Sequence, residues 1–407
     1  MKNIINKYVQ MSLISRIAIG LVLGAILGFI VPQATAIGIL GDAFVGALKA
    51  IAPILVAVIV CAAIAKAGEG IGSRFKTVIF LYMFTTFIAA FFAVIVSRVF
   101  PLTIRLVAAE GVELTPPGSL ADIFKNLLVG LVSNPINAVA SGNYLAILFW
   151  AIILGFALKL LKAEKTVDMI QDLASAFSKI VGWVIEFAPI GIMGIMFTNI
   201  STNGVAIFVD YGKLILLLVG TMLFTAFVIN PVIVAVLLKK NPYPLVLKCL
   251  KTSGIPAFFT RSSAANIPVN MKLCEELGLD KDFYSVSIPL GSTINMDGAA
   301  VVITIMSLTA ANTLGVVVPL PLAIILSIIS TLGACGTSGV AGGSLLLIPM
   351  ACSLLGISQD ISMQVVAVGF IIGVIQDSLE TALNSSGDVI FTATAEFFER
   401  ARNKKKK

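Results

Sequence analysis

Histidine is absent from this 407-residue chain, and charged residues make up only 12% of it. Without histidine there is no imidazole general base, no histidine metal ligand and no Ser-His-Asp triad. The five cysteines form no Cys-x-x-Cys pair and mostly stand in apolar context, so we interpret them as small, reduced hydrophobes. A Gly-x-x-x-x-Gly-Lys-Ser/Thr motif is also missing, so nothing indicates ATP hydrolysis by this chain.

Apolar residues dominate what is present. They make up 58% of the chain, and the mean hydropathy is +1.04, which is far outside the range of soluble domains. Because they form long runs rather than short alternating strands, the sequence predicts an all-α polytopic membrane protein and not an outer-membrane barrel. The formal net charge is +7, but the basic residues are dispersed among loops and the tail, so no nucleic-acid partner is indicated.

The long apolar runs predict eight membrane-spanning helices. Their approximate positions are 17–32, 43–65, 77–97, 144–161, 174–198, 214–238, 283–312 and 362–392. The first run resembles a signal peptide, but Gly20, Gly24 and Gly28 repeat the Gly-x-x-x-Gly spacing of packed membrane helices, so we expect a retained helix. Residues 101–143 are expected to form a long connection partly outside the lipid.

Two more apolar segments are interrupted in a way that predicts re-entrant helical hairpins. In 241–282, neither arm is long enough to span, and the polar tip Thr260-Arg261-Ser262-Ser263 divides them. In 321–355, glycine and small hydroxyl residues between Gly333 and Ser344 cannot hold a continuous helix. A single kinked spanning helix is the alternative for this second segment.

Three aspartates stand within apolar segments of the second half. Asp297 lies in an Asn-Met-Asp-Gly motif, and Asp377, Thr381, Asn384 and Asp388 follow the spacing i, i+4, i+7 and i+11. At roughly 100° per residue, these four share one helical face. A carboxylate at membrane depth costs about 2.5–3.5 kcal/mol, so such residues face a bundle interior or a water-filled cavity. The group therefore predicts cation binding.

The second half also repeats a plan: a hairpin followed by a helix that carries these polar residues. Interrupted segments in matching positions of two halves are typical of the inverted repeats of secondary transporters, which bind substrate near the membrane midplane. Basic residues favour the cytoplasmic side for both chain termini and for the first hairpin. They are Arg74, Lys76, Lys159, Lys162, Lys165, Lys239, Lys240 and the tail from Arg400 to Lys407. Arg98 and Arg105 fall on the opposite side, so the excess of basic residues on the cytoplasmic side is weaker in this part of the chain.

In these motifs the chain resembles the dicarboxylate/amino acid:cation symporter family, which includes the glutamate transporters. The Thr260–Ser263 tip, the Asn295–Gly298 motif, the glycine-rich hairpin and the Asp377 to Asp388 face occur in the family's order. The resemblance is close over the C-terminal half and looks closest to bacterial sodium/serine-threonine symporters. It implies a homotrimer in the bacterial inner membrane, with eight helices, two hairpins and elevator-type alternating access.

The resemblance also implies a division into scaffold and transport domains. Scaffold helices would lie in 1–76 and 101–200, and transport-domain elements in 77–100 and 201–407. It further implies three sites for co-transported sodium, built from carboxylates and from carbonyl and hydroxyl oxygens. The first would use Asp388 with the carbonyls of Gly291, Asn295 and Asn384. The second would use the carbonyls of Thr293, Ala334, Cys335 and Thr337. The third would use Asp297, the Asn295 side chain, Tyr82, Thr85 and Thr86.

For the substrate, the resemblance implies a small amino acid held between the two hairpin tips and the last helix. The implied contact residues are Ser262, Ser263, Val340, Gly342, Asp377, Glu380, Thr381 and Asn384. Asp377 would bind the amino group, and Asn384 with the two serines would bind the carboxylate. Members that carry acidic substrates have an arginine where this chain has Glu380, and Ala299 replaces a threonine in the same pocket. Sodium-coupled import of small neutral amino acids, serine and threonine first, is therefore expected.

Alternatives remain open from the sequence. Within the family, the chain could be a sodium- or proton-coupled symporter of acidic amino acids or dicarboxylates. Glu380 could pair with Arg261 and never meet substrate. An ion channel could use re-entrant loops, but a conduction filter favours symmetric rings of carbonyls. An intramembrane hydrolase lacks Gly-x-Ser-x-Gly and His-Glu-x-x-His motifs, so the chain is not expected to be an enzyme.

Overall fold

The computed structural model describes residues 11–66, 73–106, 125, 129–335, 337 and 342–406, and within them it is entirely helical. Five helical stretches are long and apolar enough to cross a membrane, or six if one bent pair counts as a single span. The five are Thr35–Lys66, Arg74–Val99, Ile207–Leu238, Lys281–Thr313 and Gln359–Asn403. The prediction of an all-α polytopic membrane protein is therefore confirmed.

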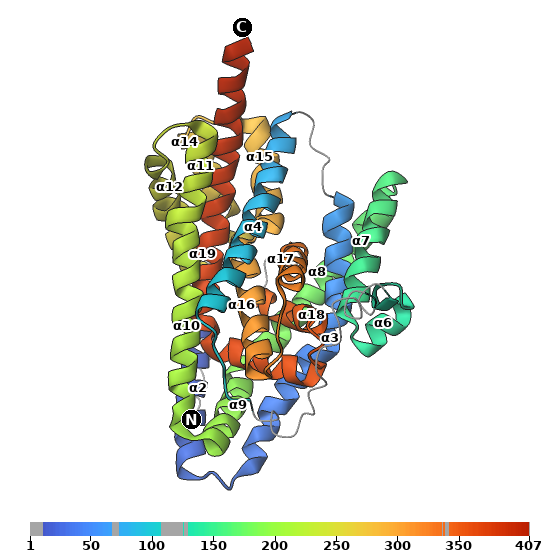
Figure 1. Ribbon diagram of the computed structural model, residues 1–407, viewed down its shortest axis with the longest axis vertical. Helices are drawn as coiled ribbons and strands as arrows, with labels where there is room; N and C mark the ends of the chain where they lie inside the picture. Colours follow the sequence, from blue (N-terminus) through green and yellow to red (C-terminus); the bar gives the residue numbers. More distant parts are fainter. Residues whose placement is uncertain are drawn as a thin grey trace.

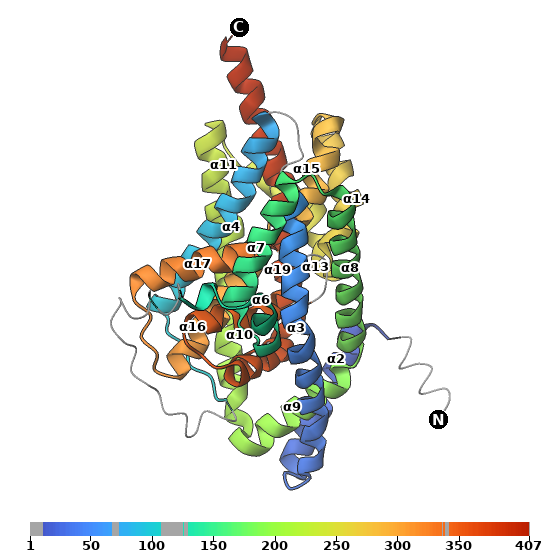
Figure 2. The same ribbon diagram turned by 90° about the vertical axis from the view of Figure 1, so that its right-hand side faces the viewer.

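The N-terminal half contributes seven α-helices and two short 3-10 turns to the described chain. They are α2 (Leu13–Ile30), η1 (Thr35–Ile37), α3 (Gly38–Lys66), α4 (Ser73–Val99), α6 (Pro135–Ser141), α7 (Tyr144–Leu160), α8 (Glu164–Glu186), α9 (Ala188–Asn203) and η2 (Gly204–Ala206). Helix α3 contacts α7, α8 and α9, and α2 contacts α9. Figures 1 and 2 show α2 and α9 together near one end of the long axis, far from the C-terminus.

Small residues bring α2 into backbone contact with α9. A Cβ built on Gly20 or Gly24 would overlap the carbonyl of Pro189 or Met193, and one on Gly28 would lie 2.8 Å from the Phe197 carbonyl. Three glycines at a spacing of four thus face one helix, and their missing side chains allow the close approach. The expected packing role of the Gly-x-x-x-Gly spacing is confirmed.

Gly24→Ala is expected to destabilise the protein in detergent, because its Cβ must displace the α9 backbone. Overpacking of this kind costs typically about 1–3 kcal/mol. Gly46→Ala is the matched control, since a Cβ on this α3 glycine meets nothing within 4 Å. A thermal unfolding scan of both variants checks the prediction, and equal midpoints for the two proteins would contradict it.

The expected continuous span 174–198 is broken in the structure. Helix α8 ends at Glu186, α9 begins at Ala188, and the two are bent by 57°. Pro189 stands in the first turn of α9, where it cannot donate a backbone hydrogen bond to the preceding turn. The break at Phe187 follows from this proline.

The C-terminal half is a succession of interrupted helices. In order they are α10 (Ile207–Phe224), η3 (Thr225–Ile229), α11 (Asn230–Leu238), α12 (Tyr243–Cys249), η4 (Leu250–Gly254), α13 (Ile255–Thr260), α14 (Ser263–Glu276), α15 (Lys281–Ile294), α16 (Asp297–Thr313), α17 (Leu320–Ala334), η5 (Gly343–Leu347), α18 (Ile348–Leu354) and α19 (Gln359–Lys406). The expected interruption between Asn295 and Asp297 is present, because α15 ends at Ile294 and α16 begins at Asp297.

The tip predicted for the first hairpin coincides with a helix break. Arg261 has a left-handed backbone with φ of 53°, and Ser262 caps α14 by accepting a hydrogen bond from the Ala265 N–H at 3.2 Å. Two helical arms, α13 and α14, therefore meet at Arg261. In the second segment, α17 ends at Ala334 and η5 begins at Gly343. Val340, an expected substrate contact, lies outside the described residues.

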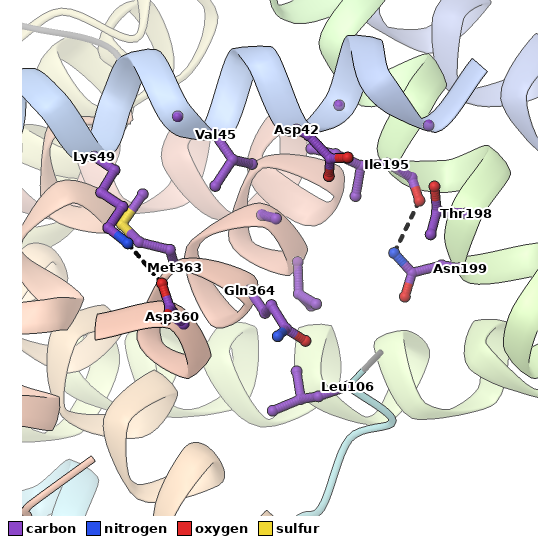
Figure 3. Close-up of a pocket in the computed structure, with 15 residues that line it drawn as sticks. Asp42, Val45, Lys49, Leu106, Ile195, Thr198, Asn199, Asp360, Met363 and Gln364 are labelled. Atoms are coloured by element: carbon purple, nitrogen blue, oxygen red, sulfur yellow. Dashed lines mark hydrogen bonds and ion pairs between the residues drawn. The ribbon is translucent and has the colours of Figure 1, made fainter. Parts of the chain in front are cut away.

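The two halves of the chain enclose a cavity of about 340 Å³ between α3, α9 and the start of α19 (Figure 3). Lys49 of α3 forms an ion pair with Asp360 of α19 at 2.6 Å along its edge. Because the Asp360 side chain is 80% exposed, this pair contributes at most about 1 kcal/mol. The cavity is lined mainly by apolar and neutral polar side chains.

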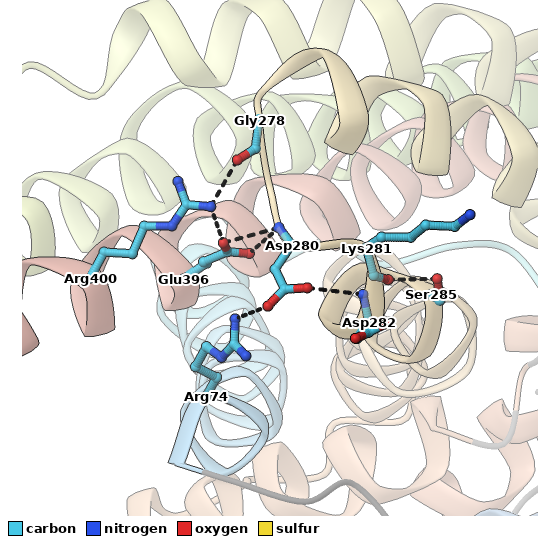
Figure 4. Close-up of polar contacts among 8 residues, drawn as sticks. All are labelled: Arg74, Gly278, Asp280, Lys281, Asp282, Ser285, Glu396 and Arg400. Carbon is cyan, nitrogen blue, oxygen red and sulfur yellow. Dashed lines mark hydrogen bonds and ion pairs between the residues drawn. The ribbon is translucent and has the colours of Figure 1, made fainter.

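A polar network joins α4, α15 and α19 at the end where the chain terminates (Figures 1 and 4). Arg74 pairs with Asp280 at 2.7 Å, Glu396 accepts from the Asp280 N–H at 3.0 Å, and Arg400 pairs with Glu396. The hydrogen bond from Arg74 holds the pKa of Asp280 below its usual value. The contribution of the Arg74–Asp280 pair to the free energy of unfolding is therefore complete at neutral pH. It is lost only as the pH falls through the lowered pKa of Asp280.

The basic residues that opposed the expected orientation have partners. Arg98 donates to the Val318 carbonyl at 2.8 Å, and Arg105 pairs with Asp210 at 3.2 Å. The charge of Arg105 is thus offset by a carboxylate, whereas Arg98 is bound only to a neutral carbonyl.

Candidate functional site

Four carboxylic side chains of the C-terminal half are buried together with one guanidinium. Asp297 and Asp388 are fully buried, and Asp377 and Glu380 are 3% and 5% exposed. Among the described side chains, Arg261 is the one basic group that forms an ion pair with any of the four. An apolar interior cannot hold this excess of negative charge without protons or bound cations. The cluster is therefore suited to binding cations.

The surroundings of Asp388 leave one carboxylate oxygen without a partner. Asn295 donates to Asp388 Oδ1 at 3.1 Å, and the Tyr82 hydroxyl donates to the Asp388 carbonyl at 3.1 Å. Asp388 Oδ2 and Asn295 Oδ1 are both buried and accept no hydrogen bond from the residues that the structure describes. A Cβ on Gly291 would lie 2.9 Å from Asp388 Oδ1, so only glycine lets the α15 backbone come this close. Of the first expected sodium set, Asp388, Asn295 and Gly291 thus lie together.

Asp297 is held at the start of α16 by groups from two other helices. Thr86 of α4 donates to Asp297 Oδ1 at 3.1 Å, and Asn230 of α11 donates to Oδ2 at 3.1 Å. The Thr86 hydroxyl also accepts from the Met296 N–H at 3.2 Å, which fixes the break before α16. Thr85 is equally buried but donates within its own turn, to the Tyr82 carbonyl at 3.2 Å.

The oxygens expected to form the second sodium site come from α15 and the end of α17. Thr293 and Cys335 both line a cavity of about 380 Å³, whose other walls are α3 and α8. The Ala334 carbonyl accepts from the Thr337 N–H at 3.0 Å and from its hydroxyl at 2.8 Å. The cavity gives water a place beside these residues.

Asp377 and Glu380 lie near each other on α19 but have different partners. Arg261 Nε donates to Asp377 Oδ2 at 2.7 Å, and the Gly342 N–H donates to Oδ1 at 3.2 Å. Glu380 accepts from the Ser344 hydroxyl at 2.7 Å and from Gln376. The alternative in which Glu380 pairs with Arg261 is therefore wrong for this structure, because the arginine reaches Asp377 instead. Asp377 links both hairpin segments to α19.

The remaining expected substrate contacts lie on the same elements. Asn384 accepts from the Gly298 N–H at 2.7 Å, and Thr381 donates to the Asp377 carbonyl at 2.8 Å. Ser262 is used as the cap of α14, and Ser263 is 6% exposed in its first turn. Helices α13 and α14 both contact α19, so the hairpin tip and the polar face of α19 are neighbours.

Sequence reasoning missed several polar residues that join these elements. Asn230 reaches Asp297, and Ser344 reaches Glu380. Asn266 and Asn270 of α14 both donate to the Ser385 hydroxyl, at 2.8 and 3.0 Å. An available signal was the placement of asparagine inside apolar runs, since a buried amide needs partners. The cavity of Figure 3 contains none of the expected site residues.

An all-helical membrane protein with broken helices around buried, incompletely paired carboxylates has the architecture of an ion-coupled secondary transporter. The chain matches the Sodium:dicarboxylate symporter family over residues 13–397 and belongs to it. The family resemblance is thereby confirmed: this is a multi-pass membrane protein of a transporter family and not an enzyme. Sodium, expected above as a co-transported ion, is in such a family a transported substrate and not a cofactor.

Relatives extend over nearly the whole chain. The serine/threonine transporter SstT of Streptococcus agalactiae serotype III (strain NEM316) is 58% identical over 396 residues, which cover 97% of this chain and 98% of that protein. SstT of Streptococcus thermophilus (strain ATCC BAA-250 / LMG 18311) is 57% identical with the same coverage. SstT of Bifidobacterium adolescentis is 58% identical over 386 residues, which cover 95% of this chain and 90% of that protein.

Proposed function

We propose that this protein is a sodium-coupled symporter that imports serine and threonine across the bacterial cytoplasmic membrane. The sodium coupling is supported by one observation at Asp388. Its buried Oδ2 and the buried Oδ1 of Asn295, which bonds to the same carboxylate, have no hydrogen-bond partner among the described residues. An alkali cation is a hard ion that prefers such oxygens, and its charge would offset the buried carboxylate. The similarity to serine/threonine transporters over 97% of the chain supports the substrate.

We assign Asp377 to the substrate ammonium group. In this structure the Arg261 guanidinium forms an ion pair with that carboxylate. An amino acid that brings its own ammonium group would replace Arg261, whose positive charge would then be free to attract the substrate carboxylate. Ser262, Ser263 and Asn384 are the proposed neutral donors for that carboxylate. The three sodium sites expected from the family are retained as part of this proposal.

Elevator-type alternating access in a homotrimer completes the proposal. The transport domain comprises residues 77–100 and 201–407, and the scaffold comprises 1–76 and 101–200. Eight spanning helices and two re-entrant hairpins follow when α12–α14 and α17–α18 enter and leave on one side, with both termini cytoplasmic. The close, glycine-mediated packing of α2 on α9 supports their assignment to one rigid scaffold.

Counterflow in proteoliposomes tests the function. Vesicles loaded with unlabelled serine and sodium should accumulate labelled serine and threonine, and replacement of sodium by potassium or choline should abolish accumulation. Labelled aspartate and glutamate should exchange poorly, because Glu380 opposes a second carboxylate. Undiminished exchange without sodium would contradict the coupling. Faster exchange of aspartate or glutamate than of serine would instead favour the acidic-substrate alternative.

Glu380→Arg is expected to weaken serine and threonine transport and to admit aspartate. The new guanidinium would offer a bidentate partner for a second carboxylate. The substitution would also remove the hydrogen bonds that Ser344 and Gln376 donate to Glu380 in wild type. Competition of unlabelled aspartate against labelled serine measures the shift. Glu380→Gln is the control, since it removes charge but keeps shape. An unchanged ratio of serine to aspartate affinity in Glu380→Arg would show that residue 380 does not contact the substrate side chain.

A further inference from the structure

A local defect in one spanning helix directs Asn230 into the protein interior. Five residues of π-helix, Thr225–Ile229, separate α10 from α11, and the Asn230 N–H bonds to the Thr225 carbonyl, five residues back. Pro231 follows and cannot donate to the Phe227 carbonyl four residues before it. That carbonyl instead accepts from the Tyr243 hydroxyl at 3.2 Å. The π-turn thus accommodates the proline, and such turns are frequent at functional sites.

The Asn230 side chain is fully buried, and only one of its two polar atoms has a hydrogen-bond partner among the described residues. Its Nδ2 donates to Asp297 Oδ2 at 3.1 Å, whereas its Oδ1 is buried with no partner among the described residues. The orientation of the amide is fixed chemically, because Oδ1 in the place of Nδ2 would face a carboxylate oxygen and be repelled. An unpaired amide oxygen at membrane depth is costly. The bond to Asp297 explains the Nδ2 group of this residue, and Oδ1 is left without a structural role among the described residues.

Three helices converge on this point. Helix α10, which continues through the π-turn into α11, contacts both α4 and α16, and Figure 1 shows them side by side. Thr86 of α4 satisfies one oxygen of Asp297, and Asn230 satisfies the other. In this arrangement the carboxylate receives hydrogen bonds from two neutral donors and forms no ion pair within the described part of the chain. Asn230 therefore lies within reach of a cation bound to Asp297 Oδ2.

We propose that Asn230 is a ligand of the cation at Asp297 and that its amide rotates when the ion binds. Without the ion, Nδ2 supplies a partial positive charge to the carboxylate. With the ion, a rotation of the amide by about 180° turns Oδ1 toward the cation, because a hard cation is bound by amide and carboxylate oxygens and not by an NH₂ group. This inference rests on the proposed sodium coupling and adds to it a ligand from α11.

The test is the sodium dependence of serine counterflow in Asn230→Leu, which has similar volume but no oxygen. The sodium concentration for half-maximal exchange should rise roughly tenfold or more, since the bound ion would lose one buried amide oxygen as a ligand. The serine concentration for half-maximal exchange at saturating sodium should stay within about twofold. Asn199→Leu is the matched control, because Asn199 is buried in α9 and bonds only within its own helix, to the Ile195 carbonyl.

A second variant and a spectroscopic measurement distinguish the loss of a cation ligand from a loss of folding. Asn230→Thr keeps one oxygen, so its sodium requirement should lie between those of wild type and Asn230→Leu. Sodium-minus-choline infrared difference spectra of wild type should contain a shifted asparagine C=O band that Asn230→Thr lacks. A wild-type band that persists in Asn230→Thr, or a sodium requirement in Asn230→Leu equal to that of the Asn199→Leu control, would overturn the role of Asn230. Sodium-independent exchange by wild type would instead refute the proposed coupling itself.

Discussion

Asp388→Asn is expected to raise the sodium concentration needed for serine exchange by roughly 30- to 1000-fold, because loss of one partner of a buried charge pair costs about 2–4 kcal/mol. The variant keeps the size of the side chain and an oxygen for the bond from Asn295, which lies 3.1 Å from Asp388 Oδ1 in wild type. What it loses is the negative charge that offsets a bound cation. Sodium titration of serine counterflow is the measurement.

Asp360→Asn is the matched control for this change, because Asp360 lies on the same helix but its side chain is 80% exposed. Its sodium requirement should stay within about twofold of wild type, because this exposed carboxylate forms only a surface ion pair with Lys49 and lies outside the buried cluster. If Asp388→Asn behaved like this control, Asp388 would not neutralise a transported ion. Asp297→Asn should raise the sodium requirement in the same direction.

Asp377→Asn is expected to abolish serine binding while sodium binding survives. The substitution removes the carboxylate proposed for the substrate ammonium and leaves Arg261, paired with it at 2.7 Å in wild type, without an ionic partner. The pocket then repels an ammonium group, which explains why the expected loss is larger than that of one hydrogen bond. Serine-induced and sodium-induced shifts of thermal stability in the purified protein separate the two effects.

The outcome distinguishes two roles for Asp377. Loss of the serine-induced shift with a preserved sodium-induced shift supports a substrate ligand. Serine exchange at a wild-type rate would mean that Asp377 serves only to anchor Arg261 and the hairpin tip. Loss of both shifts in a folded protein would place Asp377 among the sodium ligands instead. Thr394→Val is a useful control on the same helix, because Thr394 is buried outside the expected sites and its hydroxyl bonds to the Ile390 carbonyl in its own helix.

Much of the fold was predictable because it depends on local rules. Apolar runs predicted the helices, and the spacing of Gly20, Gly24 and Gly28 predicted a close helix contact that is present. The break between Asn295 and Asp297 and the tip at Arg261 also follow from residues that disfavour a continuous helix. The break at Phe187 was missed because the apolar run 174–198 continues across Pro189, and composition alone does not show where a proline bends a helix.

Pairings across distance could not be predicted in the same way. Helical periodicity puts Asp377 and Glu380 on neighbouring faces of α19. Which of the two carboxylates pairs with Arg261 depends on where the tip between α13 and α14 lies. Asn230 was missed because its partner is 67 residues away and its orientation depends on a π-turn. Such contacts are set by tertiary packing, which a pattern within one helix does not encode.

The network of Arg74, Asp280, Glu396 and Arg400 has a mechanical consequence for the ions. It fastens together the ends of α4, α15 and α19, the helices that carry Tyr82, Gly291 and Asp388. Helices locked at one end and packed along their length cannot slide past one another without breaking these bonds. If the proposed cations bind among these helices, they would therefore have to move together with all three helices and could not pass along a gap opening between them.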